Sequence, residues 1–222
     1  MREVFEQNDG CPICRMRDTI EERMTDYILG DAMMEPDVRI ETNKAGFCEY
    51  HYDKMMNRRG RLQLALMLQT HINEINTEIF AKKLFNSDGK KAENAKRISD
   101  SCFICSKTEW GLSRLIETVY RCYETEKDFR DMFNAQSCFC LPHYERLIAG
   151  AAKKNMHSYC SEFKENLNRI TSAYSDALYS DLSKYCTMYD YRSRDGETDW
   201  GNSRDAVERT VAFLNGRIYK EE

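Results

Sequence analysis

The sequence is poor in features that break helices or cross membranes. Its 222 residues hold only three prolines and ten glycines, so long helices can form with few interruptions. The longest apolar run, residues 64–68, is far too short to span a bilayer. The N-terminal MREVFEQNDG lacks the basic-then-apolar pattern of a secretory signal peptide. We therefore expect a soluble, cytoplasmic protein that makes no membrane contact.

The sequence also lacks the charge and the motifs of several function classes. Its net charge of −4 provides no overall attraction to nucleic acid. There is no phosphate-binding glycine loop, nucleophile elbow or H-E-x-x-H motif. The carboxylates of Glu21, Glu22 and Asp26 have the pattern of a solvated helix face. Nucleic acid is not an expected partner, and no catalytic residue is identified.

Cysteine is abundant, and part of it repeats. The chain has ten cysteines, which in a reducing compartment favour metal or redox chemistry over structural disulfides. CPIC at residues 11–14 matches CFIC at 102–105, and FCEYH at 47–51 matches FCLPH at 139–143. The first pair of motifs is offset by 91 positions and the second by 92. The pattern predicts an internal duplication.

Each repeat carries the ligands that tetrahedral zinc prefers. A C-x2-C pair reaches one ion, and C-x2-H places its ligands three residues apart on one helix face. We predict one zinc ion per half, two per chain, with a helix over residues 15–33 and an extended return closing the first site. The predicted ligands are Cys11, Cys14, Cys48 and His51 in the first half, and Cys102, Cys105, Cys140 and His143 in the second.

Three other roles for these cysteines compete with zinc binding. An iron–sulfur cluster bound by three thiolates and one imidazole is the alternative cofactor. Disulfides within the C-x2-C pairs would leave the matched histidines unexplained, and a thioredoxin-like pair needs a βαβ setting. Cys138 lies two residues before Cys140, but its counterpart in the first half is Gly46. Cys138 is therefore left out of the ligand set.

The remaining cysteines and histidines have ordinary structural interpretations. His71 falls on the apolar face of a helix and is predicted to be a core histidine, and His157 is expected at the surface near a helix start. The other cysteines lie on apolar stripes, where burial is common. They are Cys122, Cys160 and Cys186.

The periodicity predicts an all-α fold. We expect an internally duplicated helical protein with two Cys3His metal knuckles and a long C-terminal helical segment. The first repeat with its following helix covers residues 1–88, the second repeat covers 89–155, and C-terminal helices over 156–222 pack on both. These parts are expected to form one compact unit.

Several segments have more specific predictions. A helix over residues 60–85 has buried candidates at Leu62, Leu66, Ile72, Ile75, Ile79 and Phe80. Residues 86–96 are predicted as the linker between the halves. One long helix is predicted over 156–189, an irregular loop over 190–201, and a last helix capped by Asn202 or Ser203.

Six segments together resemble a family of uncharacterised bacterial proteins classed as a domain of unknown function. They are CPICR (11–15), MEPDVRIETN (34–43), GFC with its following histidine (46–51), the second C-x2-C (102–105), FCLPH (139–143) and DWGNSRDAVER (199–209). The resemblance covers nearly the whole chain. It implies a bacterial, soluble, helical protein and brings no established activity.

The leading functional prediction is a zinc-binding module for interaction or regulation. Metal sites with four protein ligands are usually structural, so a protein partner or a second copy of the chain is expected. The alternative is a metal- or thiol-dependent enzyme of anaerobic bacterial metabolism, with an iron–sulfur cluster as one option. Of the two predictions, the non-enzymatic module is favoured over the enzyme.

Overall fold

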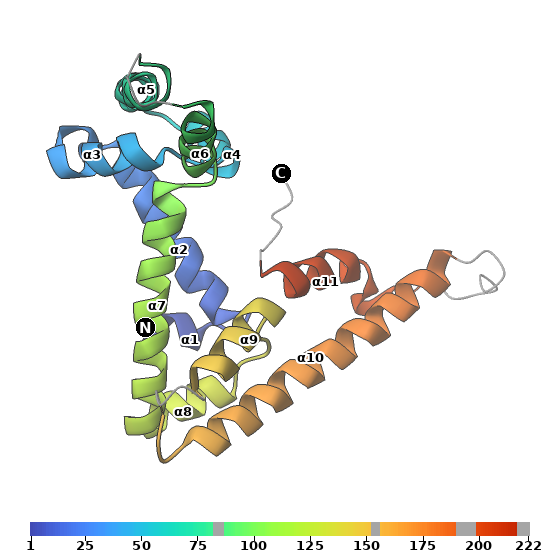
Figure 1. Ribbon diagram of the computed structural model, residues 1–222. Helices are drawn as coiled ribbons and strands as arrows, with labels where there is room; N and C mark the ends of the chain where they lie inside the picture. The colour runs from blue at the N-terminus through green and yellow to red at the C-terminus, as the bar shows by residue number, and fades with distance from the viewer. Residues whose placement is uncertain (82–86, 152–155, 190–198, 217–222) are drawn as a thin grey trace. The chain divides into compact units, whose positions relative to one another are not determined.

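The chain is helical throughout the part that the structure describes. The computed structural model describes residues 1–81, 87–151, 156–189 and 199–216 (Figure 1). These residues form helices and no β-strand, which confirms the predicted all-α fold. No helix among them is both long and apolar enough to cross a membrane.

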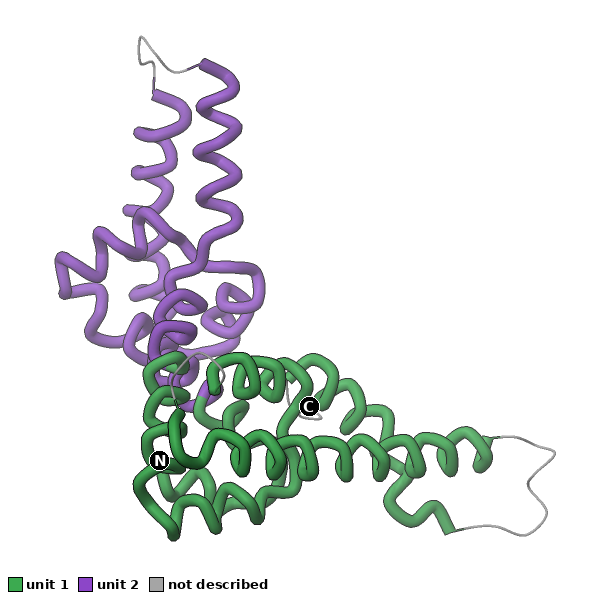
Figure 2. The backbone as a smooth tube through the Cα atoms, turned by 60° about the horizontal axis from the view of Figure 1, so that its bottom comes forward, with its two compact units in different colours: residues 1–16, 112–222 green, residues 17–111 purple. Residues whose placement is uncertain are grey.

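The contacts divide the chain into two compact units, which Figure 2 shows in different colours. Unit 1 comprises residues 1–16 and 112–222, and unit 2 comprises residues 17–111. The boundary falls within two helices, α2 (Pro12–Leu29) and α7 (Phe103–Thr125). The three-part division at residues 88 and 155 stays a prediction.

Unit 2 packs short helices around an apolar core. Between α2 and α7 it holds η1 (Asp31–Met34), α3 (Pro36–Ala45), α4 (Glu49–Met56), α5 (Arg61–Ile75), η2 (Asn76–Phe80) and α6 (Asp88–Ser99). Its buried core includes Ile28, Leu29, Phe47, Met55, Leu64, Met67, Phe103 and Ile104. Phe47 and Phe103 are part of this core. Their packing therefore fixes the positions of the adjacent Cys48 and Cys102.

His71 is a buried core histidine, as predicted. Its side chain lies on α5, and its Nδ1 atom is 2.7 Å from the backbone oxygen of Asn43. The ring packs on Gly46, where a Cβ atom would come within 2.6 Å of Nε2 and where φ is +61°. Both the space and the backbone conformation therefore require glycine at this position, immediately before the FCEYH motif.

Two segments of unit 2 are helical where the sequence predictions were wrong. Residues 36–45, expected to return in extended form, are helix α3, which starts with Pro36 in its first turn. Within the predicted linker over 86–96, residues 88–96 belong to helix α6, and Asn86 lies outside the described residues. The hydroxyl oxygen of Ser87 caps α6 by accepting a hydrogen bond from the backbone N–H of Lys90.

The apolar residues of α5 and η2 are less buried than predicted. Ile79 is buried, as expected, but Leu62, Ile72 and Phe80 are 68%, 53% and 69% exposed. The helix therefore presents apolar side chains on more than one face, and only one of these faces is covered by unit 2.

Unit 1 is built around a cluster of aromatic rings. Besides the rest of α7 it holds α1 (Arg2–Glu6), α8 (Lys127–Asn134), α9 (Leu141–Gly150), α10 (Cys160–Tyr189), η4 (Gly201–Ser203) and α11 (Ala206–Asn215). Neighbouring ring centroids lie 4.8–5.9 Å apart among Phe5, Tyr120, Tyr123, Phe129, Phe133, Phe139 and Phe163. Each buried ring contributes about 2 kcal/mol by leaving water, and Phe139 thereby holds the start of the second C-x2-H motif.

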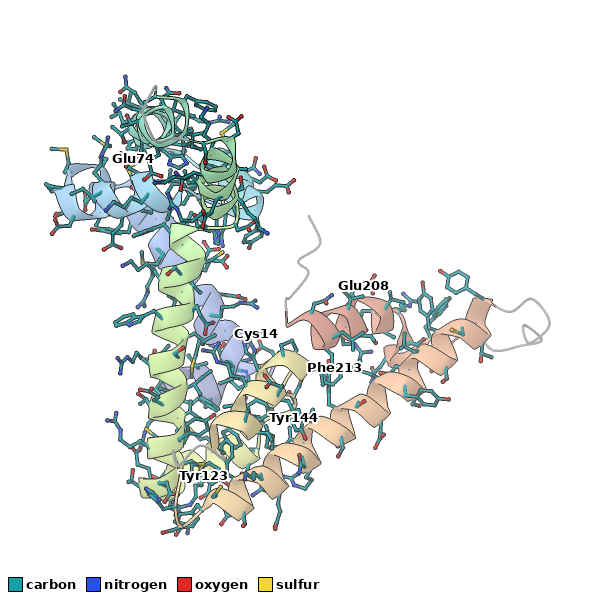
Figure 3. The ribbon with its side chains drawn as sticks, viewed as in Figure 1. Cys14, Glu74, Tyr123, Tyr144, Glu208 and Phe213 are labelled. Carbon is teal, nitrogen blue, oxygen red and sulfur yellow. The ribbon has the colours of Figure 1, made fainter. Side chains whose placement is uncertain are left out.

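Helix α10 confirms the predicted long C-terminal helix. It packs against α8, α9 and α11 (Figure 1). Phe213 of α11 lies toward α10 in Figure 3, with its ring centroid 5.8 Å from that of Tyr174. The last helix begins at Ala206, after the short turn of η4, and so later than predicted. Residues 190–198 of the predicted loop lie outside the described residues.

The remaining thiols differ in exposure. Cys122 and Cys160 are half-buried, whereas Cys186 is exposed, so the predicted burial is wrong for Cys186. His157 is exposed shortly before α10, as predicted.

Candidate metal centres

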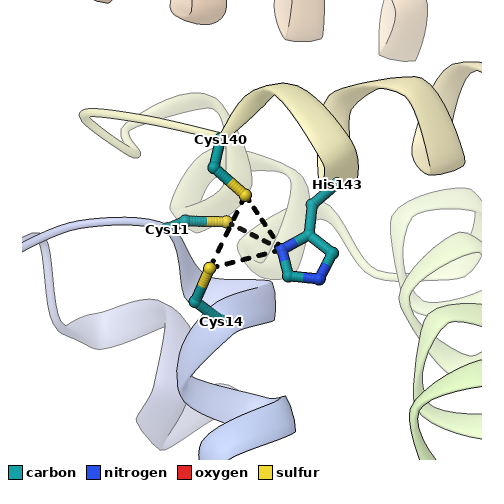
Figure 4. A group of neighbouring side chains, drawn as sticks. All are labelled: Cys11, Cys14, Cys140 and His143. Atoms are coloured by element: carbon teal, nitrogen blue, oxygen red, sulfur yellow. Dashed lines mark hydrogen bonds between the residues drawn. The ribbon is translucent and has the colours of Figure 1, made fainter. Parts of the chain in front are cut away.

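The first cluster, site 1, is formed by Cys11, Cys14, Cys140 and His143 (Figure 4). Cys11 directly precedes α2 and Cys14 lies in its first turn, while Cys140 is the N-cap of α9 and His143 lies in its first turn. Both motifs thus open helices, where the positive end of the helix dipole favours thiolate over thiol. All four side chains are buried.

The ligand atoms of site 1 surround one point. The His143 Nδ1 atom lies 3.0 Å from Cys140 Sγ, 3.4 Å from Cys14 Sγ and 3.6 Å from Cys11 Sγ. The Cys14 and Cys140 sulfurs are 3.5 Å apart, and all four atoms lie within 4.8 Å of one another. No disulfide joins these sulfurs, since Cys11, Cys14 and Cys140 are all free cysteines.

The second cluster, site 2, is formed by Cys48, His51, Cys102 and Cys105, at the starts of α4 and α7. The His51 Nδ1 atom lies 3.2 Å from Cys48 Sγ, 3.3 Å from Cys102 Sγ and 3.4 Å from Cys105 Sγ. The Cys48 and Cys105 sulfurs are 3.7 Å apart. The two sites therefore share a donor set and nearly the same spacing.

All eight predicted ligands lie in these clusters, but their predicted grouping is wrong. Each C-x2-C pair meets the C-x2-H pair of the other half, so neither half closes a site by itself. Helix α2 carries the chain away from Cys11 and Cys14 over about 27 Å. An extended return could cover that distance, but the ten residues of α3 advance only about 15 Å. Cys48 therefore meets the start of α7 instead of the start of α2.

The charge balance of both sites favours a central cation. In site 2, burial raises the pKa of Cys102, but contacts with the His51 ring outweigh this and lower the pKa to about 6. Burial and the neighbouring Cys102 sulfur raise the pKa of Cys105. In site 1, contact with Cys11 raises the pKa of Cys140 to about 12, while Cys11 itself has a strongly lowered pKa. A divalent ion at either site would lower the pKa of the surrounding thiols, because it favours their charged form.

The carboxylate of Glu21, predicted to be on a solvated helix face, lies next to site 2. Glu21 of α2 places its Oε2 atom 3.7 Å from the buried Nε2 atom of His51, which has no hydrogen-bond partner. Glu21 also accepts hydrogen bonds from Tyr50 Oη (3.0 Å) and Lys54 Nζ (2.6 Å). Burial raises its pKa, but His51 and Lys54 outweigh this and hold the pKa at about 2.

This arrangement is typical of metal-bound histidine. Burial lowers the pKa of His51, but the sulfur of Cys102 and the carboxylate of Glu21 outweigh it and raise the pKa to about 10. In metal sites a carboxylate that accepts a hydrogen bond from the far ring nitrogen orients the imidazole and increases its basicity; Glu21 is on that side of His51, at ion-pair distance. The sequence offered no signal for this contact, because Glu21 and His51 lie far apart along the chain and meet only in the fold.

The end of α11 covers site 1. Gly216 has a φ of +65°, and a Cβ atom there would lie 3.2 Å from Cys140 Sγ. Its carbonyl oxygen is 3.2 Å from Cys14 Sγ. A glycine just past a helix end has a sequence signal as a C-cap, but its contact with the sulfurs is a tertiary feature.

A cavity of about 300 Å³ adjoins site 1 within unit 1. Three ligand sulfurs contribute to its wall, together with Cys138, Tyr174, Arg209 and Phe213. Cys138 is buried but lies outside the ligand cluster, in agreement with its exclusion from the sequence-based ligand set. Burial, with the nearby sulfurs of Cys11 and Cys140, raises the pKa of Cys138.

The described residues define a cysteine-rich, all-helical protein with two Cys3His clusters that can each hold a metal ion. The chain belongs to a family of unknown function (DUF6062), whose model matches residues 1–221. No curated protein and no solved structure matches it. Since the function of the family is unknown, function has to be argued from the two sites.

Proposed function

We propose that both sites bind zinc and that the protein is a zinc-stabilised helical module for interaction or regulation. The spacing of the ligand atoms carries this proposal. Zinc bonds of about 2.3 Å to sulfur and about 2.05 Å to nitrogen place tetrahedral sulfurs about 3.8 Å apart, and sulfur and nitrogen about 3.6 Å apart. The corresponding distances are 3.5 and 3.7 Å between sulfurs and 3.0–3.6 Å from sulfur to nitrogen.

The compactness of the sites favours a single ion over an iron–sulfur cluster. All ligand atoms of each site lie within 4.8 Å of one another. A cluster holds several irons and bridging sulfides between its ligands, so its cysteines must stand further apart. Zinc with three thiolates and one imidazole is a common structural combination. A cytoplasmic location, where thiols stay reduced, suits these sites.

The interaction part of the proposal is supported by exposed apolar side chains. Four protein ligands complete a tetrahedral zinc ion, which leaves no coordination position for a substrate. Leu62, Ile72 and Phe80 are exposed along α5 and η2. Exposed apolar side chains are one feature of surfaces that bind another protein or a second copy of the chain.

One observation favours the second candidate, a metal- or thiol-dependent enzyme. The cavity beside site 1 brings three ligand sulfurs and the free thiol of Cys138 to one space. Its volume of about 300 Å³ lies at the lower end of small-molecule pockets. A small substrate bound there would reach a metal-bound thiolate.

Metal analysis with an absorption spectrum, on protein purified without oxygen, tests the proposal. We expect two zinc ions per chain and a colourless protein, because each cluster is a complete ligand set. One zinc ion or none per chain would overturn it. A brown protein with a broad band near about 400 nm would replace zinc by an iron–sulfur cluster.

A further inference from the structure

The two sites share a donor set but differ in their access to solvent. In site 1 all four ligands are buried. In site 2, His51 and Cys102 are buried, whereas Cys48 is half-buried and Cys105 is exposed. Among the eight cluster residues, Cys105 alone is exposed at the protein surface, whereas three sulfurs of site 1 border only the adjoining cavity.

Access decides how a zinc-bound thiolate reacts. The metal keeps the sulfur deprotonated at neutral pH, and the thiolate is the form that attacks oxidants and electrophiles. A buried zinc thiolate reacts more slowly because the oxidant must first enter the protein, at site 1 through the adjoining cavity. An exposed one keeps its nucleophilic lone pairs in contact with solvent.

We propose that Cys105 is a site of oxidation by hydroperoxides and that site 2 is a zinc site opened by this oxidation. The inference rests on the proposed zinc binding. It adds a chemical difference between the two sites. Site 1 keeps its metal ion in the presence of peroxide, and site 2 releases its ion when Cys105 is oxidised.

The second sulfur needed for a disulfide is already adjacent. Cys48 Sγ lies 3.7 Å from Cys105 Sγ, and a disulfide brings the two sulfurs to about 2.05 Å. Attack of the Cys105 thiolate on the peroxide breaks the O–O bond, oxidises the sulfur to a sulfenic acid and releases one water after protonation. Attack of the Cys48 thiolate on that sulfur forms the S–S bond and expels hydroxide, which leaves as a second water.

With hydrogen peroxide, the overall reaction consumes two thiolates, one peroxide and two protons, and forms one disulfide and two waters; an organic hydroperoxide would give one alcohol and one water. The ion then keeps only Cys102 and His51 as ligands, too few to hold it. Because Cys102 and Phe47 belong to the core of unit 2, zinc release loosens the packing between the start of α7 and the segment before α4. Site 1 retains its four buried ligands.

The test follows zinc release from holoprotein with a chromogenic chelator during titration with hydrogen peroxide. We expect loss of one of the two zinc ions, together with a Cys48–Cys105 disulfide identified by peptide mass mapping. A reductant with added zinc should restore the second ion. The experiment is done with the Cys186→Ser variant as well, since this exposed cysteine is no ligand, and its removal should leave the release unchanged.

A second variant separates oxidation from simple metal loss. Cys105→His replaces the thiolate by another zinc ligand that cannot form a disulfide, so it should keep two zinc ions and lose the peroxide response. If this variant fails to fold, the disulfide map of the wild-type protein still decides. Release of both ions together, release from site 1 through its cavity, or a disulfide elsewhere would overturn the inference. Fewer than two zinc ions before peroxide is added would instead overturn the proposed function.

Discussion

At the scale of single residues, the two sites differ in the groups that surround identical ligands. His51 has the Glu21 carboxylate near its far nitrogen, whereas the Cys14 sulfur of site 1 contacts the backbone oxygen of Gly216. Such outer contacts orient the ligands and adjust how strongly they bind a metal. Glu21 is therefore a positioning residue for site 2, because it acts on the cluster through His51.

Replacing Glu21 by glutamine tests this role. We expect Glu21→Gln to lower the zinc affinity of site 2 by about tenfold, because outer carboxylates on metal-bound histidines usually contribute a factor of about 10–100. Competition with a chelator measures the affinity of each of the two zinc ions. Only one of them should become weaker, whereas a general loss of stability would weaken both.

Glu22→Gln is the matched control. Glu22, the next residue along α2, pairs with Lys54 and Arg58, and its side chain is 47% exposed, against 13% for Glu21. The control should leave both zinc affinities unchanged. Equal weakening in the two variants would mean that the charge of the surface network matters and the contact with His51 does not.

Cys138 provides a second test at this scale. It borders the cavity beside site 1 but stands outside the ligand cluster. Cys138→Ser should therefore keep two zinc ions per chain, while Cys140→Ser should keep one. Elemental analysis of the two purified variants checks this, and loss of an ion from Cys138→Ser would show that Cys138 is a ligand.

At the scale of elements, both sites join the starts of helices that are distant in sequence. In each half, C-x2-C opens a long helix and C-x2-H opens a shorter one. The long helix leads away from its own C-x2-C pair, and the following short helix returns too little to bring the C-x2-H pair back. The ligand pairs are therefore exchanged between the halves.

Double variants distinguish the exchanged pairing from closure within each half. Cys14→Ser with Cys140→Ser removes two ligands of site 1, so we expect one zinc ion to remain. Cys14→Ser with Cys48→Ser removes one ligand from each site, so no ion should remain. Closure within each half would give the opposite pair of results, and elemental analysis of both double variants measures the zinc content.

At the scale of the whole molecule, the metal sites close long loops. Site 1 joins Cys11 and Cys14 to Cys140 and His143, and site 2 joins Cys48 and His51 to Cys102 and Cys105. Structural zinc in small domains binds with about 10–16 kcal/mol at neutral pH, whereas a whole domain is stable by only about 5–15 kcal/mol. Loss of the metal is therefore expected to remove most of the stability of each unit.

Removal of zinc by a strong chelator should abolish the cooperative thermal transition and reduce the helical circular dichroism signal. Re-addition of zinc should restore both. The His71→Ala variant serves as a comparison, since His71 is a buried residue outside the sites. It should lower the melting temperature as an ordinary core substitution and keep two zinc ions. Metal-free protein that keeps its helicity and its cooperative transition would show that the sites are not structural, which would favour the enzyme candidate.

The sequence by itself determined the helical class, the long C-terminal helix and the eight residues that form the two clusters. Helix periodicity and the spacing of cysteine and histidine are local properties of the sequence. They do not depend on the path that the chain takes between the motifs. The exclusion of Cys138 from the clusters followed from comparing the two repeats, which also needs no structure.

Only the tertiary structure decided which ligands meet. The grouping depends on how far each segment between the motifs advances. Residues 36–45 form a helix, and a helix covers less than half the distance that the same residues would cover as extended chain. The exposure of Cys105 and the contact of Glu21 with His51 arise in the same way, because each depends on which helices pack against one another. Local sequence specifies the ligands, while the path of the chain between them specifies the sites.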